Sequence, residues 1–249
     1  MKEKIIGLYP MTKFIFIICY MVIGLFIPSI VGRLIWFACL NVIVIMSGTF
    51  KDFFKSVYGG VGTVAILMLL MQGLFYPGEK VVLELGAFAF KEEGLLYSVK
   101  LSLLLFIIVG AFIWYFEVTT HKEFIYALED AGLPPKASFV VLATLQMIPV
   151  LQKKSATIMN AQRARGVETE GNLWVRMKVF IPTLGPLVLS SIASTEERAL
   201  TMEARGFSAP VKKTHLYTLE KRTVDKVIEK VIIVGTVLFI VWRIVSWLW

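Results

Sequence analysis

Long apolar runs, separated by short polar stretches, occupy both ends of the chain. Five are long or apolar enough to be considered as membrane spans: residues 14–30, 34–46, 57–76, 95–116 and 227–249. A helix needs about 20 apolar residues to cross the hydrocarbon core of a bilayer, with a lower limit of about 17. Run 34–46 is shorter, and it qualifies only if its helix extends through Arg33 or Ser47 or if it packs inside the protein. The pattern predicts an all-α membrane protein with about five transmembrane helices.

Residues 117–226, between the fourth and fifth runs, form a polar segment that is too long for a connection without structure of its own. Its first predicted helix, 119–131, opens with Thr120 followed three positions later by Glu123, which is the spacing of a capping box. The helix is expected to end at 132–135, where a glycine precedes two prolines.

Two longer helices are predicted at 136–165 and 173–205, and both follow the same plan. Each is apolar in its first half and charged in its second half, and each ends at a glycine suited to the left-handed conformation that terminates helices. Pro149, Pro182 and Pro186 interrupt the apolar halves, so neither half reaches the length of a span without a proline. We expect both helices to lie along or under the membrane, with their polar ends in the cytoplasm.

The same tripeptide closes both helices: Ala164, Arg165 and Gly166 in the first, and Ala204, Arg205 and Gly206 in the second. One interpretation is two ordinary helix ends, because glycine is common there and a basic residue in the last turn favours the helix dipole by roughly 0.3–1 kcal/mol. The other is two equivalent contacts with a partner, since the small alanine allows close approach and the planar guanidinium suits a carboxylate. The neighbours Arg163 and Glu203 differ between the copies, so the two partner surfaces need not be identical.

Composition and charge support a membrane protein. The chain is 57% hydrophobic, whereas a soluble domain is usually about 45–50% apolar. The net charge of +8 is more typical of cytoplasmic loops than of a protein that binds nucleic acid. Cys19 and Cys39 both fall in apolar runs, which favours buried small side chains over a disulfide or a metal site.

The distribution of lysines predicts the orientation. Lys2 and Lys4 precede the first run, and Lys51 and Lys55 lie between the second and third, so these residues belong on the cytoplasmic side. The loop 77–94 is net acidic and fits the other side. Counting spans then places the N-terminus and the central polar segment in the cytoplasm and the C-terminus outside.

Several stretches match the motifs of one known family: Ala161-Gln162-Arg163-Ala164-Arg165-Gly166, Met202-Glu203-Ala204-Arg205-Gly206-Phe207, the turn Gly132-Leu133-Pro134, and Tyr9-Pro10-Met11-Thr12-Lys13. Over nearly its whole length the chain resembles the transmembrane (T) component of energy-coupling factor transporters, which are ABC-type importers of vitamins and of cobalt or nickel ions in prokaryotes. The last stretch is similar to the family's Asp-Pro-Arg-Thr-Lys signature and departs from it at Tyr9 and Met11.

The resemblance implies a coupling subunit of the prokaryotic cell membrane. Its expected domains are 1–116 with the first four spans, 117–226 as a cytoplasmic coupling domain, and 227–249 as the last span. The two Ala-Arg-Gly helix ends would each dock on one of two ATP-binding cassette ATPase subunits, with Arg163 and Glu203 in supporting roles. The apolar faces would hold a separate membrane protein, the substrate-binding S component. ATP and Mg²⁺ would be bound by the partner ATPases, and no cofactor or metal is expected in this chain.

Two other classes of protein are less consistent with the sequence. The chain has no Gly-x-x-x-x-Gly-Lys-Ser/Thr phosphate loop, which argues against ATP hydrolysis by that route. A membrane-embedded enzyme would need a site such as Glu117 and His121, four positions apart on one expected helix face, although His215 is the only other histidine. A self-contained transporter would be expected to have inverted repeats, whereas the repeat here runs in one direction and lies in the central segment.

Overall fold

The computed structural model describes residues 7–77, 80–85, 88–167, 172–210 and 221–248. The chain divides into two compact units: Met1–Gly132 together with Leu219–Trp249, and Leu133–Thr218. The first unit contains the apolar runs, and the second contains the two longer helices of the central segment.

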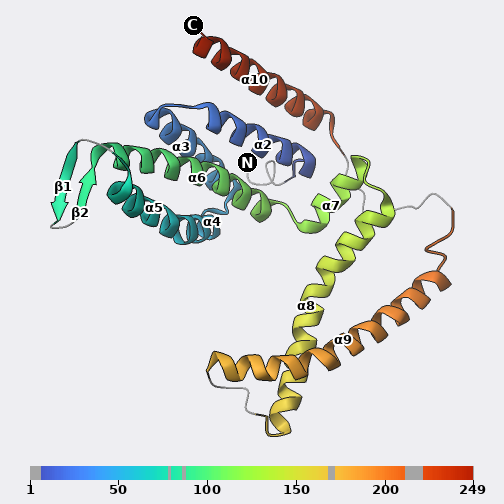
Figure 1. The fold of residues 1–249 in the computed structure, drawn as a ribbon. Coiled ribbons are helices and arrows are strands. Elements are labelled where there is room, and N and C mark those ends of the chain that lie inside the picture. Colours follow the sequence, from blue (N-terminus) through green and yellow to red (C-terminus); the bar gives the residue numbers. More distant parts are fainter. Residues whose placement is uncertain (1–6, 78–79, 86–87, 168–171, 211–220, 249) are drawn as a thin grey trace. The chain divides into compact units, whose positions relative to one another are not determined.

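The first unit consists of helices and one short hairpin (Figure 1). Its elements in chain order are α2 (Pro10–Phe26), α3 (Ile30–Ser47), α4 (Phe50–Ser56), a π-helical turn (Val57–Val61), α5 (Gly62–Phe75), β1 (Val81–Leu85), β2 (Phe88–Lys91), α6 (Glu92–Val118), α7 (His121–Asp130) and α10 (Thr223–Leu248).

The apolar runs of the sequence correspond to these helices. The second run, which was too short as 34–46, extends at both ends to form the 18-residue α3, and Gly48 terminates it in the left-handed conformation with a φ of 74°. Within the described residues, three helical stretches have the length and apolarity of a membrane span: Ile30–Ser47, Phe50–Phe75 and Glu92–Val118. The 17-residue α2 is apolar but shorter. These helices confirm the all-α membrane class, and the total of about five spans stays a prediction.

The segment expected to be the loop 77–94 contains an antiparallel β-hairpin. Strands β1 and β2 pair with Leu85 opposite Phe88, and the register is interrupted between Val81 and Leu83. The hairpin joins the end of α5 to the start of α6, and it lies at the end of α6 opposite α7 (Figure 1).

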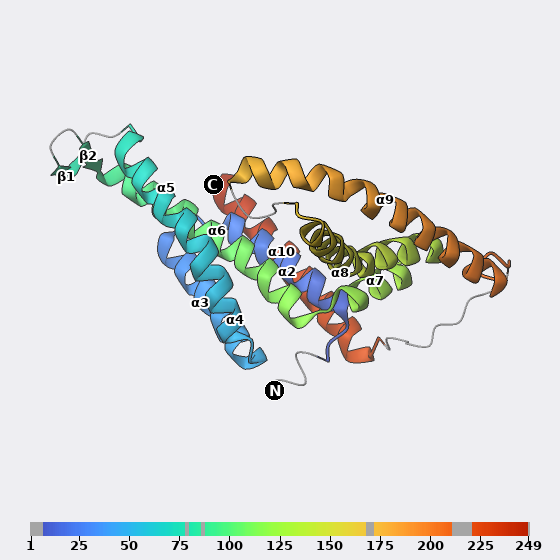
Figure 2. The ribbon, with the colours of Figure 1, turned by 90° about the horizontal axis from the view of Figure 1, so that it is seen from below.

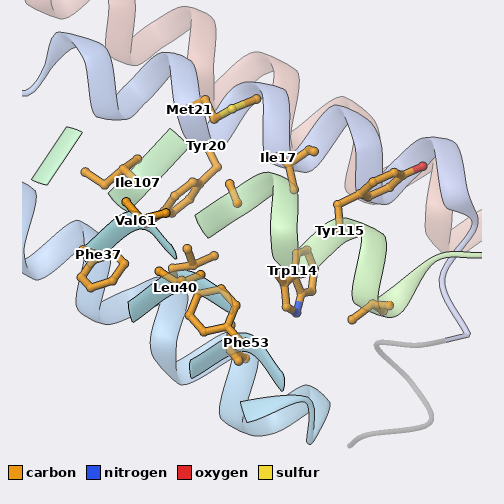
Figure 3. Packing of buried hydrophobic residues seen from close by; sticks show 14 residues of the cluster. Ile17, Tyr20, Met21, Phe37, Leu40, Phe53, Val61, Ile107, Trp114 and Tyr115 are labelled. Atoms are coloured by element: carbon orange, nitrogen blue, oxygen red, sulfur yellow. The ribbon is translucent and has the colours of Figure 1, made fainter. Parts of the chain in front are cut away.

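Side chains from four helices form the core of the first unit. Ile17 of α2, Leu40 of α3, Phe53 of α4 and Ile107 of α6 are fully buried, and Figure 3 shows them among the packed helices. Protein interiors are close-packed, so these contacts fix how the helices lie against one another.

A reciprocal pair of hydrogen bonds joins α2 to α3. The Tyr20 hydroxyl donates to the Trp36 carbonyl oxygen (2.6 Å), and the Trp36 indole N–H donates to the Tyr20 carbonyl oxygen (3.1 Å). The two rings also stack, with centroids 4.8 Å apart and planes 13° apart. Bilayer hydrocarbon offers no hydrogen-bonding partner, so internal pairing of these polar groups favours the packed helices.

Helix α2 lies between α6 and α10 (Figures 1 and 2). At its end, the Arg33 Nε donates to the Ile27 carbonyl oxygen (2.8 Å), and the Arg243 Nε of α10 donates to the Phe26 carbonyl oxygen (3.2 Å). The last carbonyls of a helix have no partner within it, and the two guanidinium groups satisfy two of them here. Since Arg243 is close to the end of α10, α2 and α10 run in the same direction.

Polar side chains tie the start of α2 to α7 and to the start of α10. The Tyr9 backbone N–H donates to Asp225 Oδ1 (3.2 Å), the Tyr9 hydroxyl donates to Asp130 Oδ2 (2.8 Å), and the Thr12 hydroxyl donates to Glu229 Oε1 (2.9 Å). The ammonium of the buried Lys13 is attracted by Asp225 and by Glu123. We call this set the polar junction: Tyr9, Thr12, Lys13, Glu123, Asp130, Asp225 and Glu229.

The polar junction holds both chain segments that flank the second unit. Helix α7 directly precedes that unit, and α10 follows it, and both are bonded to the stretch from Tyr9 to Lys13. Burial, followed by the hydrogen bond to Asp130, raises the pKa of the Tyr9 phenol, so this group keeps its proton and remains a donor. The compact units divide after Gly132 and before Leu219, whereas the domain boundaries at 116/117 and 226/227 stay a prediction.

Candidate functional site

The second unit is formed by α8 (Pro135–Ala164) and α9 (Leu173–Ala204), which cross each other (Figure 1). Both helices start and end within one residue of the predicted ranges. They continue through their internal prolines, which are Pro149 in α8 and Pro182 and Pro186 in α9.

Helix α8 ends in a compact hydrogen-bonded cap. Gly166 adopts a left-handed φ of 84°, and its N–H donates to the Arg163 carbonyl oxygen (2.9 Å). The next N–H, that of Val167, reaches back to the Gln162 carbonyl oxygen (3.1 Å). These two bonds define a Schellman motif, in which Arg165 is the last residue before the glycine.

Helix α9 ends in the same way. Gly206 has a φ of 74°, its N–H donates to the Glu203 carbonyl oxygen (2.9 Å), and the Phe207 N–H donates to the Met202 carbonyl oxygen (3.0 Å). The Phe207 ring also contacts the Phe139 ring near the start of α8, with centroids 4.9 Å apart. The repeated tripeptide therefore produces two copies of one local structure.

The glycines and the arginines have different roles in this structure. A residue with a Cβ atom pays roughly 1–2 kcal/mol in the left-handed conformation, so the cap explains Gly166 and Gly206. The cap bonds use only the backbone of Arg165 and Arg205, and both side chains are exposed. Within the described part of the chain, neither guanidinium has a hydrogen-bonding or charged partner. The ordinary helix-end interpretation accounts for the glycines, whereas for the arginines it offers only a helix-dipole contribution of roughly 0.3–1 kcal/mol.

The surroundings of the two arginines differ in charge. Arg163 and Glu203 occupy the same position of the two caps, two residues before the arginine, and both are exposed. Glu203 accepts a hydrogen bond from the Ser208 hydroxyl. The end of α8 thus presents two positive charges, whereas the end of α9 presents an arginine beside a carboxylate. Ala164 and Ala204 are also exposed, so no large side chain covers the backbone next to either arginine.

The expected pair of Glu117 and His121 on one helix face was wrong. Glu117 lies in α6, which ends at Val118, and Thr119 is extended with a φ of −125° and a ψ of 123°. His121 begins α7, whose capping box between Thr120 and Glu123 is confirmed. No group of three His, Cys, Asp or Glu residues suited to a metal occurs among the described residues, and His215 lies outside them.

Sequence reasoning missed two sets of long-range contacts. One is the polar junction, whose matching residues on α10, Asp225 and Glu229, are four positions apart and so lie on one helix face. The other is the crossing of α8 and α9, where the Lys154 ammonium donates to Ser194 Oγ (2.7 Å). The sequence offered one signal for the second contact. Lys154 and Ser194 are 40 positions apart, which is the same interval as between Arg165 and Arg205 in the repeated tripeptide.

The apolar helices of the first unit define a multi-pass helical membrane protein, and comparisons with known proteins give its family. The CbiQ family, described as a cobalt transport protein, matches residues 1–216. The energy-coupling factor transporter transmembrane protein EcfT of Streptococcus equi subsp. equi is 30% identical over 242 residues, covering 92% of this chain and 89% of the relative. Proteins of the same name from Lactococcus lactis subsp. cremoris (26% identity, 95% and 92% covered) and Staphylococcus aureus (28%, 93% and 90%) are also similar. The chain belongs to the family of energy-coupling factor transporter transmembrane (T) components.

Replacing the cap glycine should loosen the end of α9. Gly206→Ala forces a Cβ into the left-handed region. We expect it to weaken the cap by about 1 kcal/mol, which raises the equilibrium constant for opening of the cap about fivefold. Hydrogen exchange followed by mass spectrometry should show faster exchange over 203–208, and Gly206→Asn should have a smaller effect because asparagine tolerates this conformation. Gly185→Ala, inside α9 with open space around it, is the control. Unchanged exchange in Gly206→Ala would contradict the role given to the glycine.

Proposed function

We propose that this chain is the coupling subunit of an energy-coupling factor importer, and that Arg165 and Arg205 are its two ATPase-docking residues. One observation carries the proposal: two identical helix caps each present an exposed arginine that the cap itself does not need. Each would enter a groove of one ATP-binding cassette ATPase and pair with a carboxylate there. A guanidinium forms two parallel bonds with a carboxylate, which fixes orientation as well as position.

The residues beside each arginine suit close docking. Ala164 and Gly166 at one end, and Ala204 and Gly206 at the other, leave the backbone open to a partner surface. The differing charges of Arg163 and Glu203 would let two unlike ATPase subunits distinguish the two ends, because like charges across an interface cost affinity. ATP and Mg²⁺ would be bound in those subunits, and closure of the ATPase pair would move the ends of α8 and α9.

The apolar side chains of the second unit support a second partner. Large hydrophobic residues are strongly exposed on both helices, among them Val140 on α8 and Ile181 and Leu189 on α9, which are 61%, 69% and 70% exposed. Such extensive exposed apolar surface marks an interaction site or contact with lipid. We assign this surface to the bilayer and to a substrate-binding membrane S component, which would select the vitamin or metal ion taken up.

The first unit suggests how the chain lies in a prokaryotic cell membrane. The polar junction, Lys51 and Lys55, and the salt bridge between Lys221 and Glu229 lie at the end of the unit from which α2 and α10 both start. Positive charge of this kind favours the cytoplasmic side. Since α2 and α10 run in the same direction, the N-terminus would be cytoplasmic, together with the second unit, and the C-terminus would be outside.

Charge reversal at the helix ends tests the docking role. Arg165→Glu and Arg205→Glu should each weaken co-purification with the ATPases, by at least about 30-fold for a buried charge pair that loses one partner. Arg165→Lys keeps the charge but loses the two-pronged bond, so it should have an intermediate effect. The double reversal should abolish uptake of the cargo in cells.

The matched control is Lys153→Glu, a charge reversal at an exposed position in the middle of α8, about three helical turns before Arg165. It should leave ATPase binding and uptake as in the unaltered protein. Normal recovery of both ATPases by the double arginine variant would refute the docking role.

The orientation has its own test. A reporter enzyme that is active only outside the cytoplasm should be active when it is fused after Trp249 and inactive when it is placed before Met1. An inactive C-terminal fusion that is expressed at the normal level would contradict the proposed topology.

A further inference from the structure

A lysine of α8 forms hydrogen bonds to α9 where the two long helices cross. Lys154 of α8 is half-buried, and its ammonium donates to Ser194 Oγ (2.7 Å) and to the Ser190 carbonyl oxygen (3.3 Å) on α9. Hydrogen bonds from a charged donor are stronger than those between neutral groups. The small serine side chains also let α9 approach α8 closely at this point.

The crossing lies equally far along the chain from the C-terminal end of α8 and from the C-terminal end of α9. Lys154 and Ser194 are 40 positions apart, which is also the interval from Arg165 to Arg205. Each arginine therefore follows its crossing residue by the same number of helical positions, equivalent to roughly 16 Å at 1.5 Å per residue. The internal prolines of both helices precede the crossing, so the two stretches that lead to the arginines contain none.

The helical repeat adds a second regularity. The interval from the crossing residue to the arginine is close to three full turns at 3.6 residues per turn. Arg165 thus lies on the same face of α8 as Lys154, and Arg205 lies on the same face of α9 as Ser194. The crossing contact and the docking arginine share a face in both helices.

We propose that Lys154 is a positioning residue that pins the crossing, so that α8 and α9 act as two equal and rigid arms carrying Arg165 and Arg205. This inference rests on the proposed docking function. Closure of the ATPase pair would move the two ends, and the pinned crossing would transmit that movement to the apolar halves of the helices. Without the pin, the helices would slide past each other, and the movement of their ends would no longer reach the other half.

The distance between the two arms can be measured directly in the assembled transporter. Spin labels would be attached at Ala161→Cys and Thr201→Cys, which are exposed and each four positions before the arginine, after Cys19 and Cys39 are replaced by alanine. Pulsed electron resonance should give one narrow distance distribution for the unaltered crossing. Lys154→Met should broaden or shift it, whereas Lys153→Met, at the exposed neighbouring position, should not.

The functional measurement is the amount of cargo taken up per ATP hydrolysed in reconstituted vesicles. Lys154→Met removes both hydrogen bonds to α9 and should lower this ratio by about tenfold, while ATPase binding stays within about twofold. Ser194→Ala removes the hydrogen bond between Lys154 and Ser194 from the side of α9, with a smaller change in volume. A similar effect of this variant would show that the result of Lys154→Met does not come from misfolding. The double variant should be no worse than the more severe single one, since both remove one interaction.

Each outcome has one meaning. A distance distribution in Lys154→Met as narrow as in Lys153→Met, an unchanged uptake ratio, or additive effects of Lys154→Met and Ser194→Ala would overturn the pinning role. Loss of ATPase binding in Lys154→Met would also overturn it, because the residue would then act through docking. If instead the Arg165→Glu and Arg205→Glu variants keep normal ATPase binding, the docking function fails, and this result is separate because Lys154 is unaltered in those variants.

Discussion

The attachment of the end of α7 and the start of α10 to the stretch from Tyr9 to Lys13 is the constraint that organises the first unit. Asp130 at the end of α7 and Asp225 at the start of α10 both bond to Tyr9, one to its hydroxyl and one to its backbone N–H. Partly buried polar groups of this kind are costly when unpaired, so removing one member would leave its partners unsatisfied. Helix α7 precedes the second unit and α10 follows it, so the polar junction brings together the two chain segments on either side of that unit.

The repeated Ala-Arg-Gly tripeptide combines a structural requirement with an exposed chemical group. Gly166 and Gly206 end their helices because the cap bonds demand a left-handed residue. The cap holds Arg165 and Arg205 at a defined place on a rigid backbone, so less conformational entropy is lost when a partner binds them. In our proposal the partner is an ATPase because of the family to which the chain belongs. Arg163 and Glu203 have opposite charges, so the two helix ends differ in charge next to the docking arginine.

Local features were predictable from the sequence, and long-range ones were not. The capping box of α7 and the two glycine caps depend on residues within about one helical turn, so their patterns could be read directly. The bond between Tyr9 and Asp225 spans 216 positions, and its existence depends on how α2 and α10 pack. The mistaken pairing of Glu117 with His121 has a related cause, because the extended Thr119 separates two helices that the spacing alone could not distinguish from one. The hairpin at 81–91 likewise has no strong signal beyond its apolar residues.

The central claim is that both helix ends contact an ATPase. Photo-crosslinking in the intact transporter tests it most directly, with a photoreactive amino acid placed at position 163 or 203, which leaves both docking arginines in place. We expect each position to crosslink to an ATPase subunit, and the two positions to select different subunits if the ATPases differ. Crosslinking of both positions only to lipid or to another membrane protein, with none to an ATPase, would contradict it.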